Sequence, residues 1–170
     1  MKALPPPSER TFAARIAAGT IAAGTLSLLA LAWRGARDGS GPWAPINAVS
    51  HWIWPRRALM HHGKSARFGI PGLLIHFSST ALWAGIFSLF RRPRHGEAPM
   101  ESVARASAVA GLAAVVDLAV VPARLTPGFE HKLTARSLVL VYCAFAIGLL
   151  ASELIDEGAS GTQLSRRRRK

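Results

Sequence analysis

Residues 68–90 form one uncharged apolar stretch, which constrains the fold more than any other part of the chain. The stretch reads FGIPGLLIHFSSTALWAGIFSLF and contains no Lys, Arg, Asp or Glu. A helix needs about 20 mostly apolar residues to cross a bilayer, so this stretch is long enough to span one. Pro71 is expected in its first turn, where a missing N–H costs little. The stretch therefore predicts a transmembrane helix.

Polar residues follow one face of that predicted helix. They are His76, Ser79, Thr80 and Trp83, which recur at i, i+3, i+4 and i+7. This spacing places all four side chains on the same side of a helix. A polar stripe in a membrane helix faces protein or water, because exposing polar groups to lipid is costly. The helix is therefore expected to pack against other helices of the chain.

Three further apolar segments would supply these partners, at residues 12–33, 102–121 and 133–151. Two of them are rich in alanine at every fourth position, and such small residues let helices approach closely in lipid. The sequence thus predicts an all-α membrane protein, with four transmembrane helices in a bundle at residues 12–152. Residues 1–11 are expected to be a disordered cytoplasmic lead, and residues 153–170 a basic cytoplasmic tail.

A tryptophan-rich segment, WAPINAVSHWIW at residues 43–54, lies between the first two spans. It is too short to cross a bilayer, and Pro45 is suited to the first turn of a short helix. On such a helix Asn47, Ser50 and His51 share one face. The tryptophans, which are typical of the headgroup level of a membrane, are Trp43, Trp52 and Trp54. We expect an interfacial or re-entrant helix that lies over the bundle.

The charge distribution indicates the class of protein and its orientation. The chain has 170 residues and a formal net charge of +12, and 50% of its residues are hydrophobic. Its basic residues flank apolar segments instead of lining one face, which argues against nucleic-acid binding and is typical of a bacterial inner-membrane protein. Of the 21 Lys and Arg, twelve lie on the side of the termini and nine in the other two loops. Both termini are therefore expected in the cytoplasm, with the basic tail Arg166–Lys170 attracting anionic lipids.

Two further expectations concern processing and assembly. Ala30 and Ala32 form an A-x-A pattern before Trp33, so a cleaved signal peptide competes with the first span. The apolar run is long for a signal peptide, which favours the span. Four helices per chain are few for enclosing a transport path, so a homo-oligomer is also considered. The single cysteine, Cys143, excludes an intramolecular disulfide.

The polar residues of the interior converge on the outer half of the predicted bundle. At about 1.5 Å per residue, His76 lies roughly 12 Å and Asp117 roughly 7 Å below the outer helix ends. Antiparallel spans place these two residues in the same leaflet, so we expect them to face each other. The full candidate cluster is His76, Asp117, His51, Asn47, Ser50, Ser79, Thr80, Arg124, Glu130 and His131.

Four interpretations of this cluster stay open. The side chains can act as interhelical hydrogen-bonding glue, with Glu130 paired to Arg124 or Lys132. A metal or haem would use imidazole ligands, and the candidates are His51, His76 and His131, although no H-x-x-x-H or H-E-x-x-H spacing is present. His76 and Asp117 would also suit a proton relay. An enzyme acting on lipid lacks a nucleophile elbow, so we assign no catalytic residue and no cofactor.

Short segments resemble those of a known group of proteins. GIPGLLIHFS at 69–78 and RLTPGFEH at 124–131 are similar to elements of uncharacterised bacterial inner-membrane proteins, in particular the YagU-like group, and INAVSHW at 46–52 is similar to related hypothetical proteins. That group shares a histidine followed by an aromatic-rich, Ser-containing membrane helix, and a Leu-Thr-Pro segment after an apolar span. The resemblance covers residues 43–150. It implies an inner-membrane location, a four-helix topology and a loose link to acid resistance, and it carries over no catalytic residue.

The function expected from these features is that of a structural or stress-related membrane component. The alternative is a membrane protein that handles protons, a metal or haem through the His and Asp residues of the cluster. A Soret band or stoichiometric metal in the purified protein would favour this alternative.

Overall fold

A computed structural model describes the backbone of residues 11–90 and 99–167, and the side chains of residues 11–90 and 100–153. This part of the chain is helical and contains no strand. The elements are α1 (Phe12–Arg37), α2 (Ala44–Val49), the 3₁₀ turn η1 (Ser50–Trp52), α3 (Arg57–Met60), α4 (Ala66–Leu89), α5 (Pro99–Val115), the π-helical turn η2 (Val116–Val120), the 3₁₀ turn η3 (Phe129–His131) and α6 (Ala135–Arg167).

Four helical stretches of the described residues are long and apolar enough to cross a membrane. They are Phe12–Arg37, Ala66–Leu89, Met100–Val120 and Ala135–Glu153. The prediction of an all-helical chain with four such helices is confirmed, and the chain is suited to a multi-pass membrane protein. Residues 1–10 of the lead predicted at 1–11, the turn at 91–98 and the basic side chains of Arg166–Lys170 lie outside the described residues.

The helix ends follow local capping signals and correct one expectation. The Thr11 hydroxyl accepts a hydrogen bond from the Ala14 N–H at 3.3 Å, and the Ser65 hydroxyl accepts one from the Phe68 N–H at the same distance. Such hydroxyls satisfy N–H groups that a helix start leaves without partners. Because α4 begins at Ala66, Pro71 lies inside the helix. We had expected this proline in the first turn.

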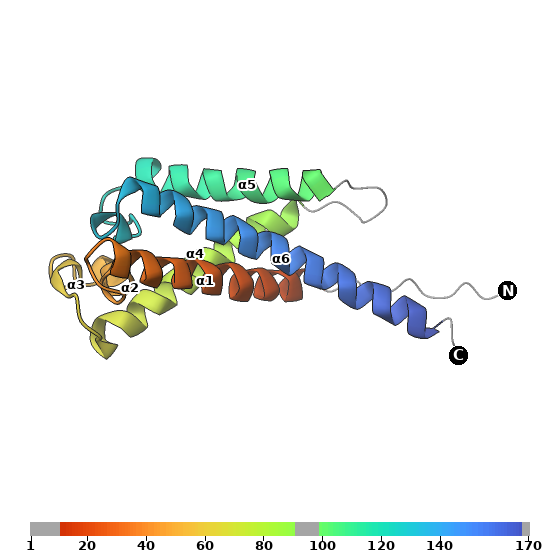
Figure 1. Cartoon of the computed structure of the whole chain (residues 1–170), viewed down its shortest axis with the longest axis horizontal. Helices are drawn as coiled ribbons and strands as arrows, with labels where there is room; N and C mark the ends of the chain where they lie inside the picture. Colours follow the sequence, from red (N-terminus) through yellow and green to blue (C-terminus); the bar gives the residue numbers. More distant parts are fainter. Residues whose placement is uncertain (1–10, 91–98, 168–170) are drawn as a thin grey trace.

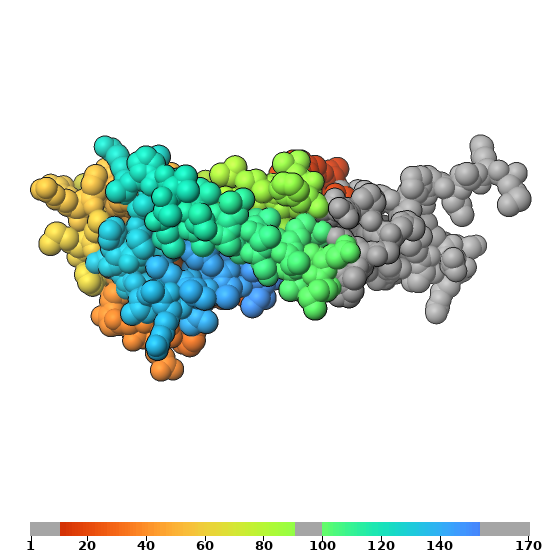
Figure 2. Space-filling view, turned by 90° about the horizontal axis from the view of Figure 1, so that it is seen from above, coloured from red at the N-terminus to blue at the C-terminus, as the bar shows by residue number. Residues whose placement is uncertain are grey.

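The four long helices run alternately in opposite directions (Figure 1). α1 packs against both α6 and α4, while α5 packs mainly against α6. The two connections at residues 38–65 and 121–134 gather at one end of the molecule, which we call the loop end. The start of α1 and the end of α4 lie toward the opposite end. α5 covers one face of the molecule beside α6 (Figure 2).

Glycine allows the closest helix approaches. A Cβ on Gly148 of α6 would lie 2.7 Å from the Ala23 backbone nitrogen and 2.8 Å from the Ala22 carbonyl oxygen of α1. A Cβ on Gly72 of α4 would collide with the Ile46 carbonyl oxygen of α2. Small residues at helix contacts permit this approach of one backbone to another, which strengthens van der Waals packing in lipid.

Two buried clusters of apolar side chains hold the helices together. The first contains Trp83, Phe87, Val109, Phe145 and Leu149, and joins α4, α5 and α6. The second lies nearer the loop end and contains Leu31, Val49, Phe129, Leu133 and Val141. Members of both clusters line the cavity described below, which therefore lies between them.

The tryptophan-rich connection is packed into the loop end. All residues from Ala44 to His51 are buried, and whether this segment is interfacial or re-entrant stays a prediction. The Trp52 indole N–H donates to the Thr126 carbonyl oxygen at 2.8 Å, which ties this connection to the one at residues 121–134. The left-handed backbone of Gly128, with φ of +84°, is required here because a Cβ would collide with Ala48 and His51.

Candidate functional site

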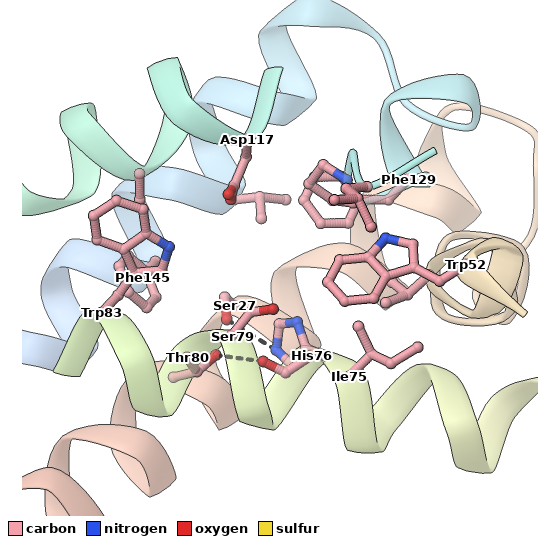
Figure 3. A pocket seen from close by; sticks show the side chains of 15 residues that line it. Ser27, Trp52, Ile75, His76, Ser79, Thr80, Trp83, Asp117, Phe129 and Phe145 are labelled. Atoms are coloured by element: carbon pink, nitrogen blue, oxygen red, sulfur yellow. Dashed lines mark hydrogen bonds between the residues drawn. The ribbon is translucent and has the colours of Figure 1, made fainter. Parts of the chain in front are cut away.

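A cavity of about 70 Å³ lies between α4 and α5 in the half of the molecule next to the loop end. Its polar wall comes mainly from α1, α4 and η2, and its aromatic wall from the loop end, α4 and α6 (Figure 3). The lining residues used below are Ser27, Trp52, His76, Ser79, Thr80, Trp83, Asp117, Phe129 and Phe145. At about 30 Å³ of liquid volume per water, the cavity has room for about two water molecules.

His76 is held on one wall by α1. Its Nε2 lies 3.1 Å from the Gly24 carbonyl oxygen and 3.3 Å from the Ser27 hydroxyl oxygen. A carbonyl oxygen can only accept, so the first contact requires a proton on Nε2. In the neutral ring, Nδ1 is then an acceptor. The Ser27 hydroxyl donates to the Ala23 carbonyl oxygen at 2.7 Å, which fixes the α1 side of this contact.

Asp117 is positioned by the π-helical turn at the end of α5. The Val121 N–H donates to the Val116 carbonyl oxygen at 3.0 Å, which marks the widened turn. The Asp117 carboxylate accepts a hydrogen bond from the Tyr142 hydroxyl of α6 at 3.1 Å. π-turns inside α-helices are rare and often occur at functional sites. The turn therefore distinguishes Asp117 from the other polar residues of the spans.

His76 and Asp117 line opposite sides of this cavity (Figure 3). Each forms its hydrogen bonds with another residue: His76 with Gly24 and Ser27, and Asp117 with Tyr142. We had expected the two to face each other, and a direct hydrogen bond was one form that this could take. The cavity brings them together without a hydrogen bond between their described atoms.

The cavity gathers only part of the predicted cluster. His76, Ser79, Thr80 and Asp117 line it, whereas the other six predicted residues do not. Three of those six fasten the loop end: Asn47 donates to the His61 and Gly63 carbonyl oxygens at 3.2 and 2.8 Å, Ser50 donates to the Asn47 carbonyl oxygen at 2.8 Å, and the His51 Nε2 lies 3.3 Å from the Ala123 carbonyl oxygen.

The remaining three predicted residues lie on the second connection. Arg124 is exposed, and the Glu130 carboxylate lies 3.6 Å from the Nε2 of His131, its chain neighbour. Among the described residues, the pairs of Glu130 with Arg124 or Lys132 that we had considered are absent, because Lys132 instead approaches His62 at 3.3 Å. Glu130 is close enough to Asp117 for the two carboxyl groups to interact electrostatically.

The metal interpretation gains no support from the geometry. Within the described part of the chain, no three His, Cys, Asp or Glu side chains gather where they would hold a metal ion. Of the histidines considered as ligands, His51 contacts backbone carbonyl oxygens, His76 contacts α1, and His131 is exposed.

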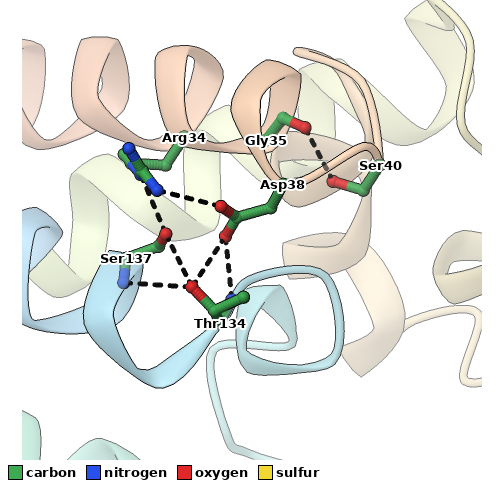
Figure 4. A network of polar contacts seen from close by, with 6 residues as sticks. All are labelled: Arg34, Gly35, Asp38, Ser40, Thr134 and Ser137. Atoms are coloured by element: carbon green, nitrogen blue, oxygen red, sulfur yellow. Dashed lines mark hydrogen bonds and ion pairs between the residues drawn. The ribbon is translucent and has the colours of Figure 1, made fainter.

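A second polar network joins the end of α1 to the start of α6 at the loop end (Figure 4). The Asp38 carboxylate accepts hydrogen bonds from the Thr134 N–H at 2.8 Å, the Thr134 hydroxyl at 3.1 Å and the Arg34 guanidinium at 3.0 Å. Arg34 also donates to the Ser137 hydroxyl at 2.8 Å. The Ser137 hydroxyl, the Thr134 groups and the Arg34 charge together hold the pKa of Asp38 below its ordinary value of 3.8.

Sequence reasoning missed several contributors to these sites. Ser27 contacts His76, and Tyr142 donates to Asp117, yet neither residue stood out in its apolar helix. A signal for Tyr142 is that it is the only tyrosine in the sequence. An ion pair was also missed: the Arg105 guanidinium lies 2.8 Å from the Glu153 carboxylate, and these side chains are 11% and 2% exposed. We had assigned Glu153 to the tail.

Comparison with protein-family models, curated proteins and solved structures finds no match to this chain. The resemblance to the YagU-like group therefore stays a prediction.

Proposed function

We propose that this chain is a multi-pass membrane protein in which His76 and Asp117 exchange protons through a hydrated cavity. The observation that carries the proposal is that two titratable side chains from different helices line one cavity of about 70 Å³. Proton relays in membrane proteins use Asp, Glu and His in such positions, and a cavity of this size admits bridging water.

The surroundings of Asp117 support the exchange of protons between its carboxylate and the loop end. Tyr142 donates to its carboxylate, and Glu130 lies within electrostatic reach. Trp52 and Leu125, both from the loop end, line the same cavity, and Leu125 is exposed. Glu130 is therefore the group that we propose to exchange protons with Asp117 on the side of the loop end.

Two measurements test the proposal. Infrared difference spectra of the purified full chain should contain a carboxyl C=O band that changes with pH and is lost in Asp117→Asn. In liposomes, the wild type should carry protons faster than Asp117→Asn and His76→Ala, while Cys143→Ser, altered at an exposed position of α6, should match the wild type. Equal flux in the wild type, Asp117→Asn and protein-free liposomes would refute proton exchange across the membrane.

The membrane placement proposed with this function is a bacterial inner membrane with both termini in the cytoplasm. The loop end would then lie at the outer headgroup level. Its exposed Trp43 and Ile53 support this placement, and Lys64 lies 5.7 Å above the Trp43 ring. Tryptophan and basic side chains are typical of the interface between lipid and water.

A structural or stress-related role is the second candidate, favoured by the polar contacts that fasten the loop end. The Asp38 network and the Trp52–Thr126 hydrogen bond connect elements far apart in the sequence, which suits a rigid component. The liposome experiment separates the two candidates, since a purely structural protein would show no flux that depends on Asp117.

A further inference from the structure

Several polar atoms that line the cavity have no hydrogen-bond partner among the described residues. They are the Ser79 hydroxyl, the His76 Nδ1 and one Asp117 carboxylate oxygen, while other atoms of His76 and Asp117 are bonded. His76, Ser79 and Asp117 are half-buried and line the cavity, so these three atoms are open to a polar occupant of it.

The charge of the cavity wall indicates whether the occupant is a cation or an anion. Asp117 brings a carboxylate, and none of the described lining residues is Lys or Arg. Three acceptor atoms therefore border one space: the Asp117 oxygen, the Ser79 hydroxyl oxygen and the His76 Nδ1. A carboxylate in surroundings of low dielectric constant is stable only with a proton or a cation beside it.

The remaining wall selects the chemistry of the cation. It is built from Trp52, Phe129 and Phe145 and from aliphatic side chains. Aromatic rings attract organic cations and pack against alkyl groups. A metal ion would instead require several oxygen ligands.

We propose that the cavity binds a small primary ammonium cation, either ammonium or a short alkylammonium. Its N–H groups would donate to Asp117, Ser79 and His76, and its alkyl group would lie against the aromatic wall. A space for about two waters admits an ion of about three non-hydrogen atoms or fewer, such as ethylammonium. The inference rests on the proposed function only in that both use the Asp117 carboxylate: a proton and the cation would occupy it in turn.

Ethylammonium is the probe that tests this inference on the full chain purified in detergent. Its binding is followed by tryptophan fluorescence, since Trp52 and Trp83 line the cavity, and by the shift of the unfolding temperature. At constant ionic strength we expect a saturable response to ethylammonium. Ethanol, which lacks the charge, and tetramethylammonium, which lacks N–H donors, should give no saturable response.

Variants locate the binding. Asp117→Asn should weaken ethylammonium binding at least tenfold, because hydrogen bonds to charged groups are the strong ones. Ser79→Ala, a smaller change on the same wall, should weaken it several-fold, and this variant serves if Asp117→Asn does not fold. Cys143→Ser should bind as the wild type does. A response that ethanol or tetramethylammonium reproduces, or that both cavity variants retain, would overturn the inference.

The pH dependence separates this inference from the proposed function. The groups that face Asp117 and titrate or carry charge are His76 of α4, Glu130 of η3 and Tyr142 of α6. If protons and ethylammonium compete, binding should weaken tenfold per pH unit once Asp117 takes up its proton. A carboxyl band that titrates without any ethylammonium binding would refute the inference and leave proton exchange intact. Binding that needs Asp117 but ignores pH would refute proton exchange and leave the cation site intact.

Discussion

Replacing Gly148 by alanine tests the contact between α1 and α6, the most extensive helix pair of the molecule. The new methyl group would lie 2.7 and 2.8 Å from backbone atoms of Ala23 and Ala22, whereas ordinary contacts are 3.4–4 Å. Backbone cannot move aside like a flexible side chain, so the helices must separate by about 0.7 Å or more to bring both contacts to 3.4 Å. A gap of ~0.5–1 Å forfeits a quarter to a half of each dispersion contact, and overpacking of this kind costs about 1–3 kcal/mol.

Gly111→Ala is the matched control. An added Cβ at Gly111 meets nothing within 4 Å, and this glycine is also in a long helix. Both substitutions gain about 1 kcal/mol of helix propensity, which cancels when the two variants are compared. We therefore expect Gly148→Ala to be about 1–3 kcal/mol less stable than Gly111→Ala.

Thermal unfolding in detergent measures this difference. For a chain of this size, 1 kcal/mol corresponds to about 2–4 °C in unfolding temperature, so Gly148→Ala should unfold several degrees below Gly111→Ala. If the two variants unfold at the same temperature, the close approach of α6 to Ala23 is wrong, and with it the helix arrangement that forms the cavity.

Three other predictions concern the charged groups. Because the pKa of Asp38 is lowered in the folded state, its contribution to stability should be present above pH 3.8 and lost as the pH falls through the lowered pKa. The free energies of unfolding of the wild type and Asp38→Asn, measured from pH 6 to 3, should therefore converge toward the acidic end. Glu153→Gln should lower the free energy of unfolding by about 3–5 kcal/mol, because it removes the carboxylate charge that contacts the buried Arg105 guanidinium. Additive losses in Arg105→Met and the double variant would show that the pair is not coupled. Reporter fusions after Lys170 and within residues 39–41 should lie on opposite sides of the membrane, with Lys170 in the cytoplasm, and a periplasmic Lys170 would reverse the proposed orientation.

Most of what could be predicted about the site came from helix periodicity and span length. The spacing of His76, Ser79 and Thr80 placed them on one face of a helix, and these three residues do line the cavity. Asp117 stood out as a carboxylate within an apolar segment. Such residues are recognisable because an ionisable or polar group inside a span is costly and so has a reason to be there.

Loop residues were harder to assign, since their partners depend on how two distant connections meet. Asn47, Ser50 and His51 were expected around the candidate site, but they bond to backbone carbonyl groups of the loop end instead. Nothing in the local sequence distinguishes a polar side chain that serves a ligand from one that satisfies a buried carbonyl, because both need the same donors and acceptors.

The sequence by itself determined the helical class, the four apolar segments long enough to span a membrane, and the polar face of α4. These features depend on residue type and on a helical period, which are local properties of the chain. Only the tertiary structure decided that His76 contacts α1, that Tyr142 donates to Asp117, and that a cavity separates the two titratable groups. Those outcomes depend on where Gly148 and Gly72 let backbones meet, and close packing of this kind is set by the shapes of several helices at once.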